Sequence, residues 1–281
     1  MKRVIKAIAF FLRYPDIFER RLIFGITSLL RLPKLIMQKK TNGVIFEFDF
    51  AYDQAIRAMF TGKYETREIK VLKNILHPGD VFIDAGANIG YFSAIAAGLI
   101  GETGTVHSFE PVPEYFQRLQ KMATMNPDYK IAVNQCALGE TEGTAQIDVT
   151  GLSNIGWNTM VAGFMKPEER KQTITVPVRR LDNYIKEHNL NNITLIKIDV
   201  EGFEFSVLKG LRGFLAETIS KPAILCEINL EACALMGYHL KDLFDYMKEF
   251  GYSAFDMNNK RIDWSNIKEL SNILFKPTKD F

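Results

Sequence analysis

The segment from residue 81 to residue 99, VFIDAGANIGYFSAIAAGL, most strongly limits how this chain can fold. An apolar strand ends at Asp84, a turn containing Gly86 and Gly90 follows, and an apolar helix begins directly after it. Glycine tolerates the positive φ angles of such a turn and lets the backbone approach a ligand closely. In doubly wound sheets this strand–turn–helix unit binds a nucleotide-like ligand beside the free N–H groups of the helix start. The segment therefore predicts an α/β fold with a ligand at the turn.

Strand and helix patterns alternate along the rest of the chain. Short apolar runs bounded by turn residues predict strands, and apolar residues at helical spacing predict the helices between them. The predicted strands cover 80–84, 105–110, 131–135, 193–199 and 222–228, and the predicted helices cover 64–76, 90–99, 113–125, 203–215 and 240–250. This alternation indicates a doubly wound, mostly parallel sheet with helices on both faces. The last thirty residues show only weak strand patterns.

Two segments depart from the alternation. Residues 140–180 place β-type runs around a loop rich in Gly and Asn, which predicts an antiparallel excursion inserted into the core as a lid. Residues 1–62 are predicted to be a basic, apolar and mainly helical extension, with a short strand or hairpin and a turn of helix over 41–62. The expected division is an extension of residues 1–62 and a main domain of residues 63–281.

The spacing within the turn distinguishes between ligands. A dinucleotide-binding turn follows G-x-G-x-x-G, whereas this one is D-x-G-x-N-x-G, with an acidic residue where a pyrophosphate would approach. S-adenosylmethionine has no phosphate and carries an ammonium and a sulfonium, which suit a carboxylate and an amide oxygen. The turn is therefore predicted to bind S-adenosylmethionine in preference to NAD. Its predicted contacts are Asp84, Gly86, Ala87, Asn88 and Gly90.

The next two strand ends extend this predicted site. Glu110 lies at the end of the following strand, where an acidic side chain can accept hydrogen bonds from both hydroxyls of a ribose. Pro111 sets the loop that would border the adenine. Ala137 and Leu138, after the third strand, are predicted to give the adenine an apolar floor.

Acidic residues also end the strand in LIKIDVEGFEFSVLKG, at 195–210. Asp199 is predicted to orient or deprotonate a substrate hydroxyl. Glu201 is predicted to bind a substrate hydroxyl or the methionine end of the cofactor, and Glu227 lies at the same edge on the next strand. A purely structural role, such as capping a helix or bracing a loop, is the alternative for these acids.

The 140–180 segment carries two further substrate-binding candidates. Trp157 suits stacking on a sugar ring, and Asn158 suits hydrogen bonding to its hydroxyls. Ordinary packing within the loop is the alternative for both residues.

The strings DAGANIGYFS, HSFEPVP, ALG, LDNYI and IKIDVEGFEFSVLKG occur in this order, and over residues 64–257 the chain resembles the FkbM-type methyltransferases. The resemblance implies a Rossmann-like class I methyltransferase fold, S-adenosylmethionine as the methyl donor, and O-methylation of a hydroxyl of a sugar, glycan or natural product. It suggests cofactor roles for the turn residues and for Glu110. Tyr64 and Glu65 match a Tyr–Glu pair that could contact the methionine end. The first forty residues lie outside the resemblance.

Methyl transfer to an alcohol requires a general base near the sulfonium, and Asp199 is the predicted base. A divalent cation held by Asp199, Glu227 and Asn229 is a less favoured alternative, and no metal is expected. A nitrogen acceptor is disfavoured because Asp-Val-Glu-Gly stands where such enzymes carry an Asp/Asn-Pro-Pro-aromatic turn. The main domain has no basic groove with interleaved aromatic residues, so no nucleic-acid partner is expected and the acceptor should be a small molecule or glycan.

The first forty residues carry a distinct charge. They contain ten Lys or Arg against two acidic residues, although the net charge of the whole chain is +2. Basic residues interleaved with apolar ones predict peripheral contact with a membrane or a partner, with a helical cap on the domain as the alternative. A cofactor-binding domain recruited by this segment is the non-enzymatic alternative. The three cysteines form no C-x-x-C pair, which favours buried thiols and a cytoplasmic location.

Overall fold

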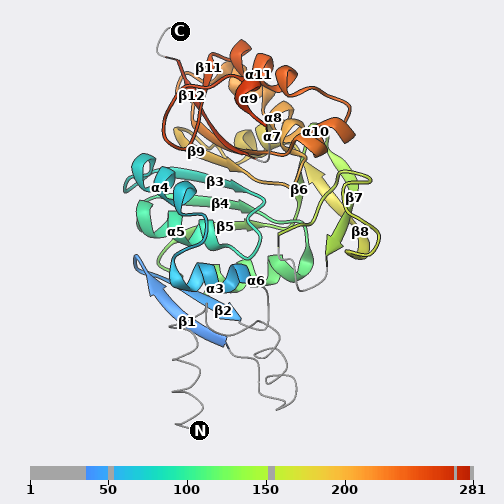
Figure 1. The fold of residues 1–281 in the computed structure, drawn as a ribbon. Helices are drawn as coiled ribbons and strands as arrows, with labels where there is room; N and C mark the ends of the chain where they lie inside the picture. The colour runs from blue at the N-terminus through green and yellow to red at the C-terminus, as the bar shows by residue number, and fades with distance from the viewer. Residues whose placement is uncertain (1–35, 50–53, 151–155, 269–270, 279–281) are drawn as a thin grey trace.

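A seven-stranded sheet forms the centre of the protein in a computed structural model that describes residues 36–49, 54–150, 156–268 and 271–278 (Figure 1). The strand order is β11-β12-β10-β9-β3-β4-β5. The strands are β3 (Val81–Ala85), β4 (Thr105–Phe109), β5 (Lys130–Asn134), β9 (Ile193–Ile198), β10 (Ala223–Ile228), β11 (Tyr252–Phe255) and β12 (Ser271–Pro277). The five strands from β5 to β10 run parallel, while β12 is antiparallel to both β10 and β11. The strand order reverses between β3 and β9, which is where ligands bind in doubly wound sheets.

Helices cover both faces of this sheet because its apolar residues alternate between two cores. Phe82 and Leu195 face a core shared with α4, α5 and α6, whereas Ile83 and Ile196 face a core shared with α7, α8, α9 and α11. The bounds are α4 (Thr66–Ile75), α5 (Tyr91–Ile100), α6 (Pro113–Thr124), α7 (Leu181–Glu187), α8 (Glu204–Lys209), α9 (Arg212–Glu217) and α11 (Leu240–Glu249). The doubly wound, mostly parallel α/β fold predicted from the sequence is confirmed.

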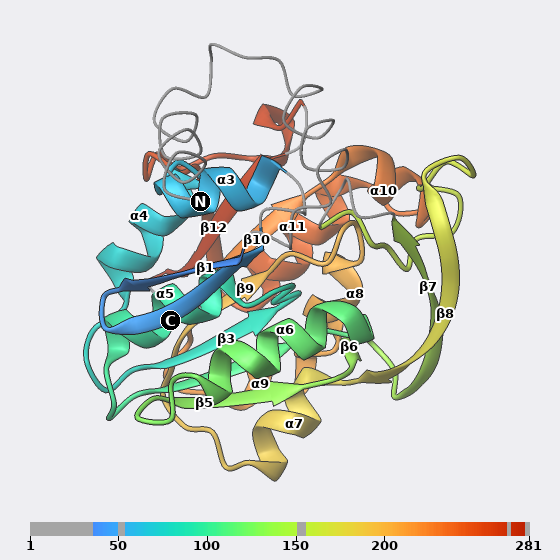
Figure 2. The same cartoon turned by 90° about the horizontal axis from the view of Figure 1, so that it is seen from below.

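A second sheet stands at one side of the molecule (Figure 2). It contains β6 (Ala137–Leu138), β7 (Gly143–Thr150) and β8 (Arg170–Arg179) in the order β6-β8-β7. β7 and β8 pair antiparallel over eight positions, and β6 pairs parallel with β8. This sheet is the predicted antiparallel excursion of residues 140–180.

A hairpin of β1 (Ile36–Thr41) and β2 (Val44–Asp49), followed by α3 (Gln54–Thr61), precedes the central sheet. Phe46 and Phe48 are buried in the same core as α5 and α6. The side-chain amide of Asn126 accepts from the N–H of Ile45 at 2.7 Å and donates to its carbonyl at 2.8 Å. These contacts join the described part of the predicted extension to the main domain. The segment with the predicted membrane contact lies almost wholly outside the described residues.

The described ranges contain no helix long and apolar enough to cross a membrane. In two places they differ from the predicted elements. The helix expected over 203–215 is two short helices, α8 and α9, which are separated at Gly210, where a Cβ atom would lie 2.1 Å from the carbonyl oxygen of Gly139. The weak strand patterns near the end of the chain include β12, which lies inside the sheet between β10 and β11.

Candidate active site

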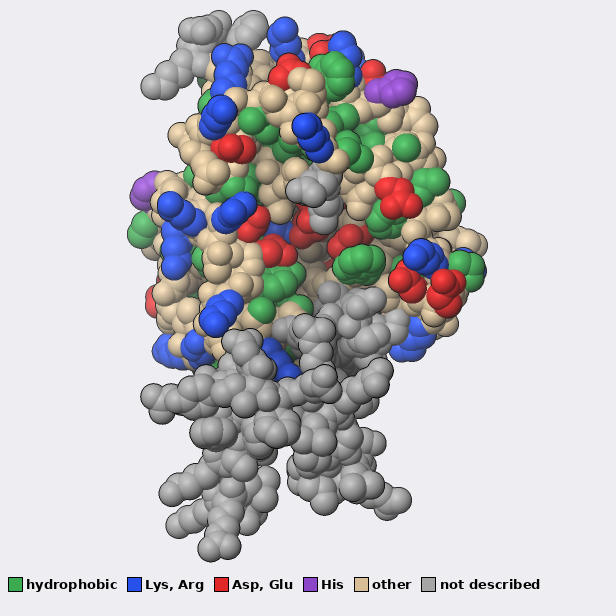
Figure 3. Space-filling model, viewed as in Figure 1, with side chains coloured by type: hydrophobic (Ala, Val, Ile, Leu, Met, Phe, Trp, Pro, Cys, Tyr) green, Lys and Arg blue, Asp and Glu red, His purple; other side chains and the backbone are tan. Residues whose placement is uncertain are grey.

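A cavity of about 260 Å³ lies at the carboxyl ends of β3, β4, β9 and β10. Acidic side chains gather around a hollow on the face shown in Figure 3. Two sets of residues in the cavity lining differ in their chemistry. The glycine-turn half consists of Gly86, Ala87, Asn88 and Glu110, and the acidic half consists of Asp199, Glu201 and Glu227.

The turn after β3 is fixed against both neighbouring strands. The N–H groups of Gly86 and Ala87 donate to the carbonyl of Phe109 at 3.1 and 2.9 Å. Gly86 has a φ of +83°, and a Cβ atom there would lie 1.8 Å from the carbonyl oxygen of Asp199. Only glycine lets the turn pass this close to the end of β9.

Glu110 forms the wall of the glycine-turn half at the end of β4. The residue is 5% exposed, and its carboxylate accepts from the N–H of Asn88 at 2.9 Å and the N–H of Val112 at 2.8 Å. Burial raises the pKa of Glu110 to about 7, although these two backbone donors oppose the rise. The carboxylate is thus held in position by backbone, with Asn88 itself in the left-handed region at a φ of 52°.

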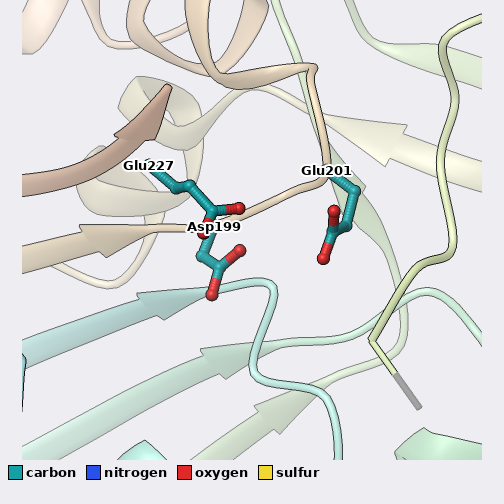
Figure 4. A group of neighbouring side chains, drawn as sticks. All are labelled: Asp199, Glu201 and Glu227. Carbon is teal, nitrogen blue, oxygen red and sulfur yellow. The ribbon is translucent and has the colours of Figure 1, made fainter. Parts of the chain in front are cut away.

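The acidic half brings together the carboxyl of Glu227 in β10 and the carboxyls of Asp199 and Glu201, which follow the end of β9 (Figure 4). One carboxylate oxygen from each of Asp199, Glu201 and Glu227 lies within 4.8 Å of the others. Burial, followed by repulsion from Asp199, raises the pKa of Glu201 to about 9 and that of Glu227 to about 10. Both glutamic acids therefore favour the neutral form near pH 7 and can donate hydrogen bonds.

Lys197 lies beside this acidic half, and the sequence analysis did not single it out. Its Nζ is 2.6 Å from Oδ2 of Asp199, and its side chain is 4% exposed. A lysine within the apolar strand ITLIKI, two residues before an acid, was the signal in the sequence, because residues two apart on a strand share a face.

Most residues predicted for the site line the cavity. They are Tyr64, Glu65, Gly86, Ala87, Asn88, Glu110, Pro111, Ala137, Leu138, Trp157, Asn158, Asp199, Glu201 and Glu227. Trp157 is 56% exposed, and the side-chain oxygen of Asn158 accepts from the N–H of Thr150 at 3.0 Å. The lining also contains residues that sequence reasoning missed, among them Met59, Phe92, Ile147, Phe164 and Lys197.

Two of the predicted cofactor residues lie outside the lining. Asp84 is fully buried, and its Oδ2 accepts from the hydroxyl of Ser93 at 2.6 Å. Gly90 faces α6, where a Cβ atom would lie 2.8 Å from Leu119. Both positions support the turn from beneath.

Asn229 was named with Asp199 and Glu227 as a ligand set for a divalent cation. Its side-chain oxygen instead accepts from the N–H groups of Glu231 and Ala232 at 3.0 and 3.2 Å, which caps α10 (Leu230–Leu235). This oxygen is therefore already engaged by the helix start.

In the mostly parallel central sheet, the antiparallel β12 lies between β10 and β11, and the cavity lies above the reversal of strand order. This arrangement defines a class I methyltransferase. The model of the methyltransferase FkbM domain matches residues 84–254. The chain belongs to the FkbM methyltransferase family.

Three curated relatives match parts of the chain. The 31-O-demethyl-FK506 methyltransferase FkbM of Streptomyces tacrolimicus is 33% identical over 66% of this chain and 76% of its own length. Methyltransferase 1 of Beauveria bassiana is 30% identical over 48% of this chain and 59% of its length. The hexuronic acid methyltransferase AglP of Haloferax volcanii is 24% identical over 52% of this chain and 56% of its length. The chain thus spans less than two thirds of the last two relatives.

Among solved structures, a methyltransferase FkbM from Methylobacillus flagellatus shares 20% identity, with a TM-score of 0.44 over 92% of this chain and 59% of that one.

Proposed function

We propose that this methyltransferase transfers the methyl group of S-adenosylmethionine to a hydroxyl oxygen of a sugar, glycan or natural product. The observation that carries the proposal is that one cavity joins Glu110 and the glycine turn to the ion-paired carboxylate of Asp199. The first half suits a nucleoside, and the second offers a proton acceptor for an alcohol.

The donor fits along the strand ends. Glu110 would accept from the ribose hydroxyls, while Pro111, Ala137 and Leu138 would border the adenine. The methionine end would pass the turn toward Tyr64 and Glu65. Because β3 lies between β4 and β9, the ends carrying Glu110 and Asp199 are about 10 Å apart, a distance that a nucleoside and its sulfur can span.

The residues would act mainly by position. Bound S-adenosylmethionine supplies a methyl group already activated by its sulfonium. Holding the acceptor oxygen in line with that carbon is worth about 7–11 kcal/mol of the barrier. Asp199 would take the proton of the acceptor hydroxyl as that oxygen becomes methylated. Neutral Glu201 and Glu227 donate hydrogen bonds to other acceptor oxygens.

Both the cavity and the relatives' names support the proposed acceptor class. One relative is named for the O-methyl position of a natural product and another for a hexuronic acid. The exposed Trp157 offers a stacking surface to such a molecule, and the partly buried Asn158 in the same lining offers an amide. The resident ammonium of Lys197 beside Asp199 favours a reaction without a divalent cation, because it repels a second cation there.

Calorimetry with S-adenosylhomocysteine tests the cofactor assignment. The protein should bind it, and Glu110→Gln should weaken binding about tenfold or more, since hydrogen bonds to a charged group contribute about 1.5–3 kcal/mol. NADH should give no heat. If the folded protein bound neither S-adenosylmethionine nor S-adenosylhomocysteine, the proposal would be refuted.

The acceptor is then sought with S-adenosylmethionine carrying a ¹³C-methyl group. Sugars and hydroxylated natural products are incubated with the protein, and the carbon shift of the product distinguishes an O-methyl from an N-methyl group. Exclusive N-methylation would refute the hydroxyl assignment.

A further inference from the structure

Lys197 lies in the middle of the central sheet, where a lysine is costly to bury. An unpaired ion in such a position costs several kcal/mol, so its partners must account for its presence. It stands directly opposite Asp84 in the pairing of β9 with β3, and its ammonium is 2.6 Å from Asp199. It also lies 4.6 Å from the centre of the Phe92 ring.

The carboxylates around Lys197 belong to different parts of the site. Burial opposes its charge, but Asp199, Asp84 and Glu65 together raise its pKa. Within the described residues, Oδ1 of Asp84 has no hydrogen-bond partner although the side chain is fully buried. Lys197 therefore pairs with Asp199 in the acidic half, and its charge also interacts with Asp84 beneath the glycine turn.

We propose that Lys197 is a positioning residue that holds Asp199 and compensates its charge, so that the acidic half does not stabilise the sulfonium of the bound donor. This inference rests on the proposed function.

The reason lies in how charge moves during methyl transfer. The sulfonium loses its positive charge as the carbon–sulfur bond breaks, so an uncompensated carboxylate stabilises the ground state more than the transition state. Binding of that kind tightens the complex without speeding the reaction. The Lys197 ammonium engages Oδ2 of Asp199 and leaves Oδ1 to take the proton of the acceptor.

The test compares two ligands that differ in one charge. S-adenosylmethionine carries the sulfonium, and S-adenosylhomocysteine carries a neutral thioether at the same place. In Lys197→Met, affinity for S-adenosylmethionine relative to S-adenosylhomocysteine should rise about tenfold, a change expected for one charge at several ångströms in a partly solvated site. Asp199→Asn should shift the ratio in the opposite direction. Lys197→Arg should keep the wild-type ratio within about twofold.

A merely structural role would change both affinities by the same factor, and an unchanged ratio in Lys197→Met and Asp199→Asn would overturn the inference. Because removing the lysine leaves Asp84 buried without a counter-ion, Lys197→Met is also combined with Asp84→Asn. Asp199→Asn keeps the lysine and probes the same pair independently.

The failure of this inference is distinguishable from failure of the proposed function. If folded wild-type protein binds neither ligand, the cofactor assignment fails. If it binds both and the variants leave their ratio unchanged, the cofactor assignment stands and the role of Lys197 is refuted.

Discussion

The glycine-turn half and the acidic half of the cavity are held in place by different forces. Backbone hydrogen bonds fix the first half. Glu110 accepts hydrogen bonds from two N–H groups, and the N–H groups of Gly86 and Ala87 donate to the carbonyl of Phe109. Side-chain charge dominates the second, where Asp199 pairs with the ammonium of Lys197 and the neighbouring Glu201 and Glu227 have raised pKa values. The glycine-turn half comes from two short segments on neighbouring strands, each with a recognisable local pattern, whereas the acidic half depends on charged side chains that the sheet brings together.

The sharpest test of this contrast is Asp199→Asn. The substitution removes the proposed base while preserving shape, so turnover with an identified acceptor should fall about 10²–10⁴-fold. Affinity for S-adenosylhomocysteine, measured by calorimetry, should change far less. Glu231→Gln, an exposed acid on α10, is the matched control and should keep normal turnover. Near-normal turnover and an unchanged pH profile in Asp199→Asn would show that another group is the base.

Gly86→Ala should damage the glycine-turn half. The added Cβ would overlap the carbonyl of Asp199, so the free energy of unfolding should fall by roughly 3 kcal/mol or more, together with cofactor binding. Gly101→Ala is the control, because Gly101 also has a positive φ, of +70°, but nothing lies within 4 Å of its Cβ position. Equal losses in both variants, measured by thermal unfolding, would show that backbone strain alone explains the effect.

The acidic half should make stability depend on pH. Glu201 and Glu227 have higher pKa values in the folded protein than in the unfolded chain. At a pH between its unfolded and folded pKa values, each group is therefore protonated in the folded state and ionised in the unfolded state. The free energy of unfolding should therefore fall as pH rises from 6 to 9, by up to about 1 kcal/mol per pH unit for each group. Glu227→Gln should flatten this slope in thermal unfolding experiments. A wild-type stability independent of pH over this range would contradict the raised pKa values.

The smallest expected effect is that of a chelator. If the Lys197 ammonium serves as the cation of the acidic half, EDTA should change turnover by less than about twofold, because a further cation would be repelled at this distance. Lost activity that Mg²⁺ restores would instead assign a metal role to Asp199, Glu201 and Glu227.

The same contrast explains what the sequence could predict. The strand–turn–helix at 81–99 and Glu110 follow local rules, and the structure places Gly86, Ala87, Asn88 and Glu110 on the cavity wall as expected. Lys197 was missed although Asp199 follows it by two residues, because the buried Asp84 opposite it lies 113 residues earlier, in a strand that only the folded sheet brings alongside. Asp84 was predicted to face the ligand, but strand alternation and the Ser93 hydroxyl hold it beneath the turn.

The position of β12 affects how the molecule is assembled. β12 pairs with β10 on one side and β11 on the other, yet it follows both in the chain. During synthesis β10 therefore keeps an open edge until residues 271–277 have left the ribosome, and β11 has no neighbour to join. Open edges of this kind invite pairing with other chains. The sheet is complete only when β12 inserts between two strands that precede it in the chain. A chain that terminates before β12 should therefore aggregate and should not form a smaller stable fold.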